Sequence, residues 1–304
     1  FMSEYILETS GLTKAYGRKK AVDNVDLKIR KGDIYGFVGR NGAGKTTVIK
    51  LIAGLAKPKE GVITLFDGKL SEGRKKLGVV IENPAYYPYM TARQNMEVQA
   101  LMKGVKDKLI IGEILEKVGL SDTGKKKVKN FSLGMKQRLG IALALIGEPE
   151  FLILDEPING LDPMGIREVR DLIINLSKNS GITVLISSHI LGELSKMCTA
   201  YGVISEGKIV DQFTSEELEQ RMRPFIKIKV DDASKAAEII NSELEISDIK
   251  EFSNHIEIYE KLDEMMAINS ALEANGINVK SISKQEGDCE DYFIKLMEGE
   301  KKDA

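Results

Sequence analysis

A glycine run followed by a lysine and two threonines has the composition of a phosphate-binding loop. The run is Gly39-Arg40-Asn41-Gly42-Ala43-Gly44-Lys45-Thr46-Thr47. Its glycines let the backbone turn tightly, so that successive amide N–H groups can point at a phosphate near the positive end of the following helix. Lys45 adds a full positive charge, and Thr46 places a hydroxyl where it can ligate the Mg²⁺ that bridges two phosphates. This spacing predicts a nucleotide phosphate site.

The alternative for this phosphate loop, Gly39–Thr47, is a plain glycine turn between a strand and a helix. The residues before it, Ile34–Val38, form a short apolar run that predicts a buried strand. A strand, a loop of this spacing and a helix start are the context that the motif requires. We therefore favour the phosphate site.

A pair of carboxylates follows a second apolar run. Phe151-Leu152-Ile153-Leu154 predicts a buried central strand that delivers Asp155 and Glu156 at its carboxyl end. We expect Asp155 to bind Mg²⁺ directly or through water, and Glu156 to polarise a water for in-line attack on the γ-phosphate. A surface acid pair is the alternative, which the phosphate loop upstream makes the weaker interpretation.

Two further residues have candidate roles in nucleotide binding. His189 ends the predicted strand Gly181–His189, and ligands bind at the carboxyl edge of parallel strands. We therefore favour sensing of the γ-phosphate by His189 over a capping or structural histidine. Tyr16 lies between two predicted strands and could stack on an adenine, although a loop tyrosine taken alone is more often packed.

Two other stretches are candidates for contact with a ligand or a partner. Ser132-Leu133-Gly134-Met135-Lys136-Gln137-Arg138 starts a predicted helix with a hydroxyl and a glycine, which suits an anion but also an ordinary capped helix. Glu82 ends the predicted strand Leu77–Glu82 and opens the loop Asn83–Met90, which holds two prolines and three tyrosines. A loop of this composition is typical of a contact surface.

The elements around these residues alternate in the manner of an α/β domain. An antiparallel pair, Tyr5–Thr9 and Val22–Ile29, opens the chain, and Thr91 predicts the N-cap of a mainly helical segment that runs to about Gly147. Beyond Arg223-Pro224 the predicted order is strand, helix, strand, strand, helix, strand, which is the ferredoxin-like plan. A final amphipathic helix, Cys289–Met297, follows it.

The composition is that of an ordinary soluble globular protein of about two domains. The chain has 304 residues and a formal charge of only −2, which argues against nucleic acid held by bulk electrostatics. Two cysteines far apart fit a reducing compartment. The sequence has neither a membrane-spanning run nor a signal-peptide pattern at its start, so we expect a cytoplasmic protein that reaches the membrane through a partner.

Taken in this order, the motifs resemble those of the nucleotide-binding subunit of an ATP-binding cassette (ABC) transporter, over roughly Met2 to Glu219. The resemblance implies ATP and Mg²⁺ as ligands and a second copy as a head-to-tail partner. It also implies the following roles: Tyr16 for adenine stacking; Gly39, Asn41, Gly42, Ala43, Gly44, Lys45, Thr46 and Thr47 as the Walker A loop; Phe151–Glu156 as Walker B with Glu156 as catalytic base; Ser132–Gln137 with Ser132 and Gly134 as the signature motif acting on the opposite subunit; Asn159–Asp162 as the D-loop; and His189 as the switch histidine.

Two departures from the family pattern affect the site. The usual leucine-serine-glycine-glycine-glutamine core of the signature is Phe131-Ser132-Leu133-Gly134-Met135 here, which loses a glycine and the amide. The Q-loop glutamine is replaced by Glu82, which can still ligate Mg²⁺, beside Thr46 and Asp155, but donates no hydrogen bond. Glu82 with its proline-tyrosine loop, and the ending Asp291–Leu296, resemble the bacitracin and lantibiotic self-protection subgroup.

The sequence thus predicts an α/β P-loop ABC-type ATPase domain over 2–221, with a mostly parallel sheet, an antiparallel β subdomain and a helical subdomain at about 91–147. A small α+β ferredoxin-like domain follows at 224–304. We expect an ATPase subunit that drives a separate membrane-spanning subunit from the inner face of the membrane, and that exports or expels an antimicrobial peptide. The alternatives are a soluble ABC ATPase acting on nucleic acid or the ribosome, and a P-loop kinase; we expect no nucleic acid partner.

Overall fold

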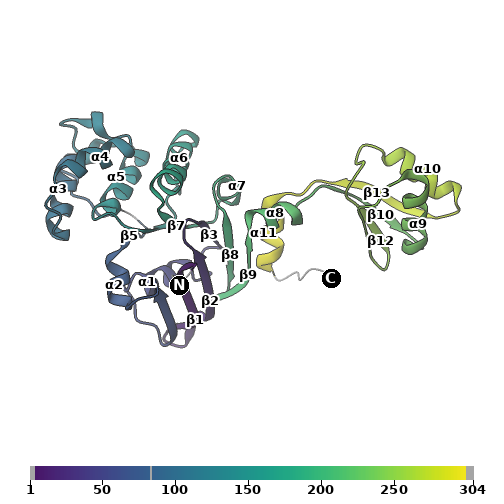
Figure 1. Cartoon of the computed structure of the whole chain (residues 1–304), viewed down its shortest axis with the longest axis horizontal. Coiled ribbons are helices and arrows are strands. Elements are labelled where there is room, and N and C mark those ends of the chain that lie inside the picture. Colours follow the sequence, from purple (N-terminus) through teal and green to yellow (C-terminus); the bar gives the residue numbers. More distant parts are fainter. Residues whose placement is uncertain (1–3, 83, 299–304) are drawn as a thin grey trace. The chain divides into compact units, whose positions relative to one another are not determined.

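The structure, a computed structural model, describes residues 4–82 and 84–298. They form two compact units. The first contains the described residues up to Ser215 together with those from Phe293, and the second contains Glu216–Tyr292 (Figure 1). The predicted domain limits at residues 2 and 304, and Asn83 at the start of the loop Asn83–Met90, lie outside the described residues.

A six-stranded sheet forms the centre of the first unit, in the order β5-β6-β7-β3-β8-β9. The first five of these strands are parallel, and β9 runs antiparallel to β8. The strands are β3 (Ile34–Val38), β5 (Leu77–Val80), β6 (Phe151–Asp155), β7 (Thr183–Ser188), β8 (Ala200–Ser205) and β9 (Lys208–Thr214). All residues of β3, β6 and β7 are buried, which explains their mainly apolar sequences. Because these three are neighbouring parallel strands, the residues that follow them meet at one edge.

A three-stranded antiparallel sheet, in the order β2-β1-β4, packs on the same core. Its strands are β1 (Tyr5–Tyr16), β2 (Lys19–Arg30) and β4 (Glu60–Leu65), so the predicted antiparallel pair is confirmed and is longer than expected. Tyr16 ends β1 and pairs with Lys19. The helix α1 (Lys45–Ile52) buries its apolar face in this core, and α2 (Leu70–Lys75) lies between β4 and β5 in sequence.

The predicted helical segment contains three helices, which Figure 1 shows grouped together. They are α3 (Ala92–Lys103), α4 (Leu109–Lys117) and α5 (Leu133–Leu145), with 3₁₀ turns at Ser121–Thr123 and Val128–Asn130. Thr91 is the N-cap of α3, as predicted. Its hydroxyl accepts a hydrogen bond from the Gln94 amide, and the Gln94 side chain accepts one from the Thr91 amide.

Three more helices follow in the chain: α6 (Pro163–Ser180), α7 (Leu191–Leu194) and α8 (Ser215–Arg221). Asp162 is the N-cap of α6, since its carboxylate accepts a hydrogen bond from the Gly165 amide at 2.8 Å. Of the helices within the described ranges, none is long and apolar enough to cross a membrane.

The second unit has the predicted ferredoxin-like order of elements. They are β10 (Phe225–Val230), α9 (Ala233–Leu244), β11 (Ile249–Glu251), β12 (His255–Ile258), α10 (Met265–Ala274) and β13 (Val279–Gln285). The strands pair in the order β11-β12-β10-β13, and every pair is antiparallel. Alternate residues of β10 and β12, such as Ile226 and Ile258, are buried in a core shared with α9 and α10.

The last helix, α11 (Cys289–Glu298), differs from the predicted division of the chain. The sequence assigned all of it to the second domain, but its residues from Phe293 belong to the first unit. The reason is the burial of Phe293, whose ring lies 5.6 Å from that of Tyr201 and 5.8 Å from that of Phe213. An aromatic cluster of this kind stabilises the contact by apolar burial.

Candidate active site

The phosphate loop leaves β3 and enters α1 at the carboxyl edge of the sheet. Two of its glycines are required by close backbone contacts. A Cβ at Gly39 would lie 2.5 Å from the Ile204 carbonyl oxygen, and one at Gly44, which has φ +116°, would lie 2.6 Å from that of Ala21. No side chain in the described structure caps α1, so its first amide groups remain available to a phosphate.

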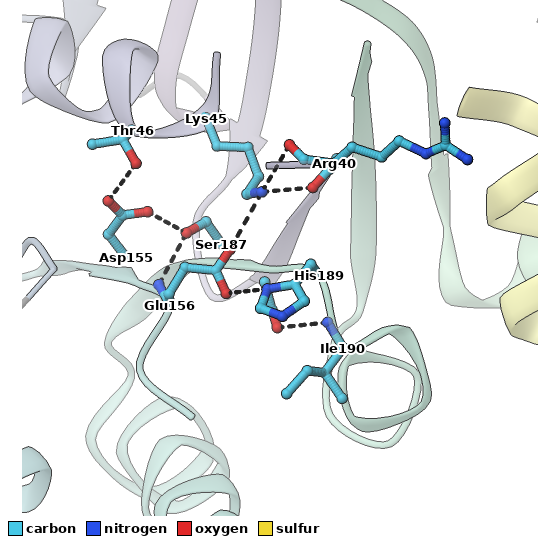
Figure 2. Close-up of polar contacts among 10 residues, drawn as sticks. Arg40, Lys45, Thr46, Asp155, Glu156, Ser187, His189 and Ile190 are labelled. Carbon is cyan, nitrogen blue, oxygen red and sulfur yellow. Dashed lines mark hydrogen bonds and ion pairs between the residues drawn. The ribbon is translucent and has the colours of Figure 1, made fainter. Parts of the chain in front are cut away.

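Lys45 is buried and lies between the phosphate loop and the carboxylates (Figure 2). Its ammonium donates to the Gly39 carbonyl at 2.5 Å and to that of Arg40 at 3.4 Å. The same Nζ lies 3.3 Å from Oε1 of Glu156. The lysine therefore connects the phosphate loop, predicted to bind nucleotide, with the residue predicted to act as base.

Asp155 is almost fully buried, with 1% of its surface exposed, and is held from two sides. The Thr46 hydroxyl donates to Oδ2 at 2.7 Å, and the Ser187 hydroxyl donates to Oδ1 at 2.5 Å. Thr46 starts α1, Asp155 ends β6 and Ser187 lies near the end of β7. The structure thus brings together two of the three oxygen donors that the sequence predicted for Mg²⁺, Thr46 and Asp155.

Glu156 lies beside His189, and both follow a strand of the sheet. Oε2 of Glu156 is 2.8 Å from Nδ1 of His189 (Figure 2). The Glu156 amide donates to the hydroxyl and to the carbonyl oxygen of Ser187, each at 3.1 Å. Glu156 has φ +53°, a strained conformation for a residue with a Cβ, and these contacts support it. The backbone at this turn therefore directs the carboxylate toward Lys45 and His189.

Tyr16 and Glu82 lie outside this cluster of contacts. Tyr16 is exposed, with the Lys14 ammonium 5.3 Å from its ring centroid. Glu82 is exposed and lies 3.2 Å from Nζ of Lys50. Lys50 is one helical turn after Thr46 on α1, so Glu82 lies near the same face of that helix.

The signature segment, Ser132–Gln137, forms a separate hollow. Ser132 is the N-cap of α5, and its hydroxyl accepts a hydrogen bond from the Met135 amide at 3.2 Å. With Gly134 and the segment Gly160–Asp162 it lines a hollow of about 500 Å³. Another hollow, of about 800 Å³, borders the phosphate loop and has a different set of lining residues. The signature and the phosphate loop of one chain therefore face different spaces.

Sequence reasoning missed Ser187, which touches both Asp155 and the Glu156 amide. The available signal was the pair of serines, Ser187 and Ser188, that follows the apolar run of this strand just before the histidine already selected. The sequence does not show which strand pairs with β6. In the structure β7 pairs with β6, and this places Ser187 opposite Asp155.

Comparison with known proteins identifies the family. The family model described as ABC transporter matches residues 22–159. The chain is also 43% identical over 299 residues to the bacitracin transport ATP-binding protein BcrA of Bacillus licheniformis, a match that covers 97% of this chain and 98% of that protein. The chain belongs to the ABC transporter ATP-binding proteins.

Two other relatives of this ABC protein extend the comparison. The lantibiotic transport ATP-binding protein SrtF of Streptococcus pyogenes is 45% identical over 220 residues, which cover 71% of this chain and 95% of that protein. The dimeric structure of the ATP-binding cassette MJ0796, in a post-hydrolysis state with ADP and Pi, superposes with a TM-score of 0.61. It is 25% identical and covers 69% of this chain and 98% of that one.

These findings confirm the predicted ABC-type P-loop fold and the ATPase activity. This ABC protein binds and hydrolyses ATP as the ATP-driven subunit of a transporter. BcrA and SrtF are transport proteins and MJ0796 is an ABC cassette, so these three relatives give no support to the alternative of an ATPase that acts on nucleic acid.

Proposed function

We propose that the contact set at the edge of the sheet is the hydrolytic site, with each residue in the role that its contacts support. Lys45 and the amides of the phosphate loop hold the phosphates, while Glu156 accepts a proton from the attacking water. His189, 2.8 Å from Glu156, orients that carboxylate and senses the γ-phosphate. Tyr16 stacks on the adenine. The observation that carries this proposal is the chain of contacts from Lys45 through Glu156 to His189.

The residues present fit a magnesium ion. The Thr46 hydroxyl and the Asp155 carboxylate lie 2.7 Å apart, and both are oxygen donors of the kind Mg²⁺ prefers. Within the described residues no group of three His, Cys, Asp or Glu side chains could hold a metal. Mg²⁺ usually keeps several waters and phosphate oxygens and takes only one or two carboxylates from the protein. When bound with ATP, the ion neutralises phosphate charge; Glu82, close to the same face of α1, is a further candidate ligand.

We further propose that two copies complete two ATP sites in a head-to-tail dimer. The signature hollow and the phosphate-loop hollow of one chain have different lining residues, so Ser132 would act on the nucleotide of the partner. Leu133 and Met164, both exposed beside the signature hollow, supply apolar area for such an interface. Leu133 stands where the family usually has a glycine, so this chain presents a bulkier side chain at that position of the signature.

Mixing two inactive variants tests the shared site. Ser132→Arg places a long cation at the signature and Lys45→Ala removes the phosphate-binding charge, so each pure dimer should be inactive. Mixed dimers have both lesions in one site and none in the other. We expect an equal mixture to recover about a quarter of the parent ATPase rate, because half of the random pairs are mixed and each holds one intact site. Inactive mixtures with mixed dimers shown to be present would rule out the shared site.

The docking surface for a membrane-spanning subunit is proposed on the tyrosine loop and the neighbouring helix α3. In this loop Tyr87 is 53% exposed and Tyr89 is 73% exposed, whereas Tyr86 is half-buried. Leu101 on α3 is exposed too, and it lines a groove of about 370 Å³ between α3 and α4. Exposed aromatic and apolar side chains in one area are typical of an interface.

The same loop is connected to both halves of the ATP site. It follows Glu82, which contacts Lys50 on α1. A Cβ at Gly140 on α5 would lie 2.4 Å from the ring of Pro84, so the loop packs closely on the helix that begins at the signature. The buried Asn95 side chain accepts from the Tyr87 amide at 2.7 Å and donates to its carbonyl at 3.1 Å. These contacts support a route from the ATP site to the docking surface.

The relatives favour an antimicrobial peptide as the transported molecule. BcrA, a bacitracin transport protein, matches along nearly the whole of both chains, whereas SrtF, a lantibiotic transport protein, is nearly covered by a match of 220 residues. The second unit therefore has a counterpart in the bacitracin relative. We propose that this ABC protein acts at the inner face of the membrane to export or expel a peptide of the bacitracin type.

Replacing Tyr87 and Tyr89 with serine tests the docking surface. The ATPase rate of the isolated protein should stay within about twofold of the parent rate, because neither side chain contacts the ATP site, while bacitracin resistance in cells should be lost. Leu55→Ser, which changes an exposed apolar residue after α1, is the matched control and should keep resistance. Resistance that survives in the double variant would place the docking surface elsewhere, and a lowered melting temperature would identify the tyrosines as structural.

A further inference from the structure

The hollow beside the phosphate loop is lined in part by the last helix, α11. It has a volume of about 800 Å³ and reaches from Lys19, the residue that pairs with Tyr16 at the end of β1, to the phosphate loop at Arg40–Ala43. It therefore borders both the loop proposed to bind the phosphates and the strand residue paired with Tyr16, which is proposed to stack on the adenine. Met297 and Glu298, the last described residues of α11, line the same hollow.

The helix α11 is held against this hollow by two contacts within the first unit. Phe293 is fully buried in the aromatic cluster with Tyr201 and Phe213. One turn further along, the Ser205 hydroxyl donates to the Met297 carbonyl at 3.0 Å. These contacts fix the direction in which Glu298 leaves the helix.

Glu298 forms an ion pair with Arg40, a residue of the phosphate loop itself. The guanidinium and the carboxylate are 2.7 Å apart and half-exposed. Figure 2 shows the Arg40 side chain pointing away from Lys45 and Glu156, toward the ribbon of α11. A cation on a phosphate-binding loop attracts a polyanion, but here its charge is neutralised by a carboxylate on the wall of the hollow.

We propose that Glu298 is a positioning residue of the ATP site: it engages Arg40 and keeps that charge from a bound nucleotide, so that α11 in this position lowers nucleotide affinity. The inference rests on the proposed role of the phosphate loop in binding ATP. Only residues 286–288 separate α11 from β13, the last strand of the second unit. A change in the second unit that draws α11 from the aromatic cluster would release Arg40 and strengthen nucleotide binding.

A double-mutant cycle on the full chain tests the proposal. The affinities for ADP and for a non-hydrolysable ATP analogue are measured by calorimetric titration for the parent, Glu298→Gln, Arg40→Gln and the double variant. Glu298→Gln should tighten binding roughly threefold to tenfold at low salt, and less at high salt, because it frees a partly exposed charge. In the Arg40→Gln background the same substitution should change neither affinity.

Glu206→Gln is the matched control, because it removes another carboxylate that lines the same hollow. Three results would each overturn the inference. Glu206→Gln could tighten nucleotide binding as much as Glu298→Gln does, or Glu298→Gln could tighten it equally in the Arg40→Gln background. The third is that Glu298→Gln does not tighten nucleotide binding at all. Both glutamates are at the surface, and unchanged melting temperatures would show that the variants are folded. If the parent protein bound neither nucleotide, the proposed role of the phosphate loop in binding ATP would be wrong, and this inference would be wrong with it.

Discussion

Replacing Glu156 with glutamine is expected to lower the rate of ATP hydrolysis by about 10²–10⁴-fold and to leave ATP binding nearly unchanged. Glutamine keeps the size of the side chain and removes its basicity, so the attacking water loses its proton acceptor. Lys45 and the amides of the phosphate loop still hold the phosphates. The variant should therefore accumulate as a dimer with ATP bound, which size-exclusion chromatography with and without ATP would detect.

Glu150→Gln is the control for this experiment. Glu150 is an exposed acid just before β6 that pairs with Lys76 at 2.7 Å, remote from the contact set around Lys45. It should keep the parent rate and should not form the trapped dimer. Near-parent turnover by Glu156→Gln would show that Glu156 is not the base, and His189 would then be the next candidate.

Replacing Lys45 with alanine should strongly weaken ATP binding and abolish hydrolysis. The ammonium is buried and supplies charge-assisted hydrogen bonds worth about 1.5–3 kcal/mol each when directed at phosphate oxygens. Losing them should weaken ATP binding by at least roughly tenfold to a hundredfold. The substitution also removes the cation 3.3 Å from Oε1 of Glu156, an atom with no other hydrogen-bond partner in the described structure. The carboxylate would then be left partly buried without a counter-charge.

The measurement for Lys45 is a direct titration with ATP, with Lys50→Ala as the matched control. Lys50 follows Lys45 by little more than one turn of α1, and its side chain is partly exposed in its ion pair with Glu82. Its loss should change ATP affinity only slightly, since exposed ion pairs contribute little. Unchanged affinity in Lys45→Ala would contradict the proposed phosphate contact.

Much of the site is encoded locally, and the sequence by itself determined those parts. The phosphate loop needs only a strand, glycines without a Cβ and a helix start, all within one continuous stretch that ends at Thr47. The caps at Thr91 and Asp162 depend on residues three positions apart, and the apolar run before Asp155 predicts a buried strand without knowledge of its neighbours. The order of elements in the second unit follows from the same short-range periodicities.

The tertiary structure alone decided which distant residues meet. Ser187 reaches Asp155 because β7 pairs with β6, and Asn95 holds Tyr87 because the loop folds back on α3. Nothing in the spacing of Arg40 and Glu298, 258 residues apart, indicates that they form an ion pair. The ion pair forms because Phe293 is buried against β8 and β9 in the first unit. Burial of an apolar side chain is non-directional, so the local sequence does not indicate which distant residues it will pack against.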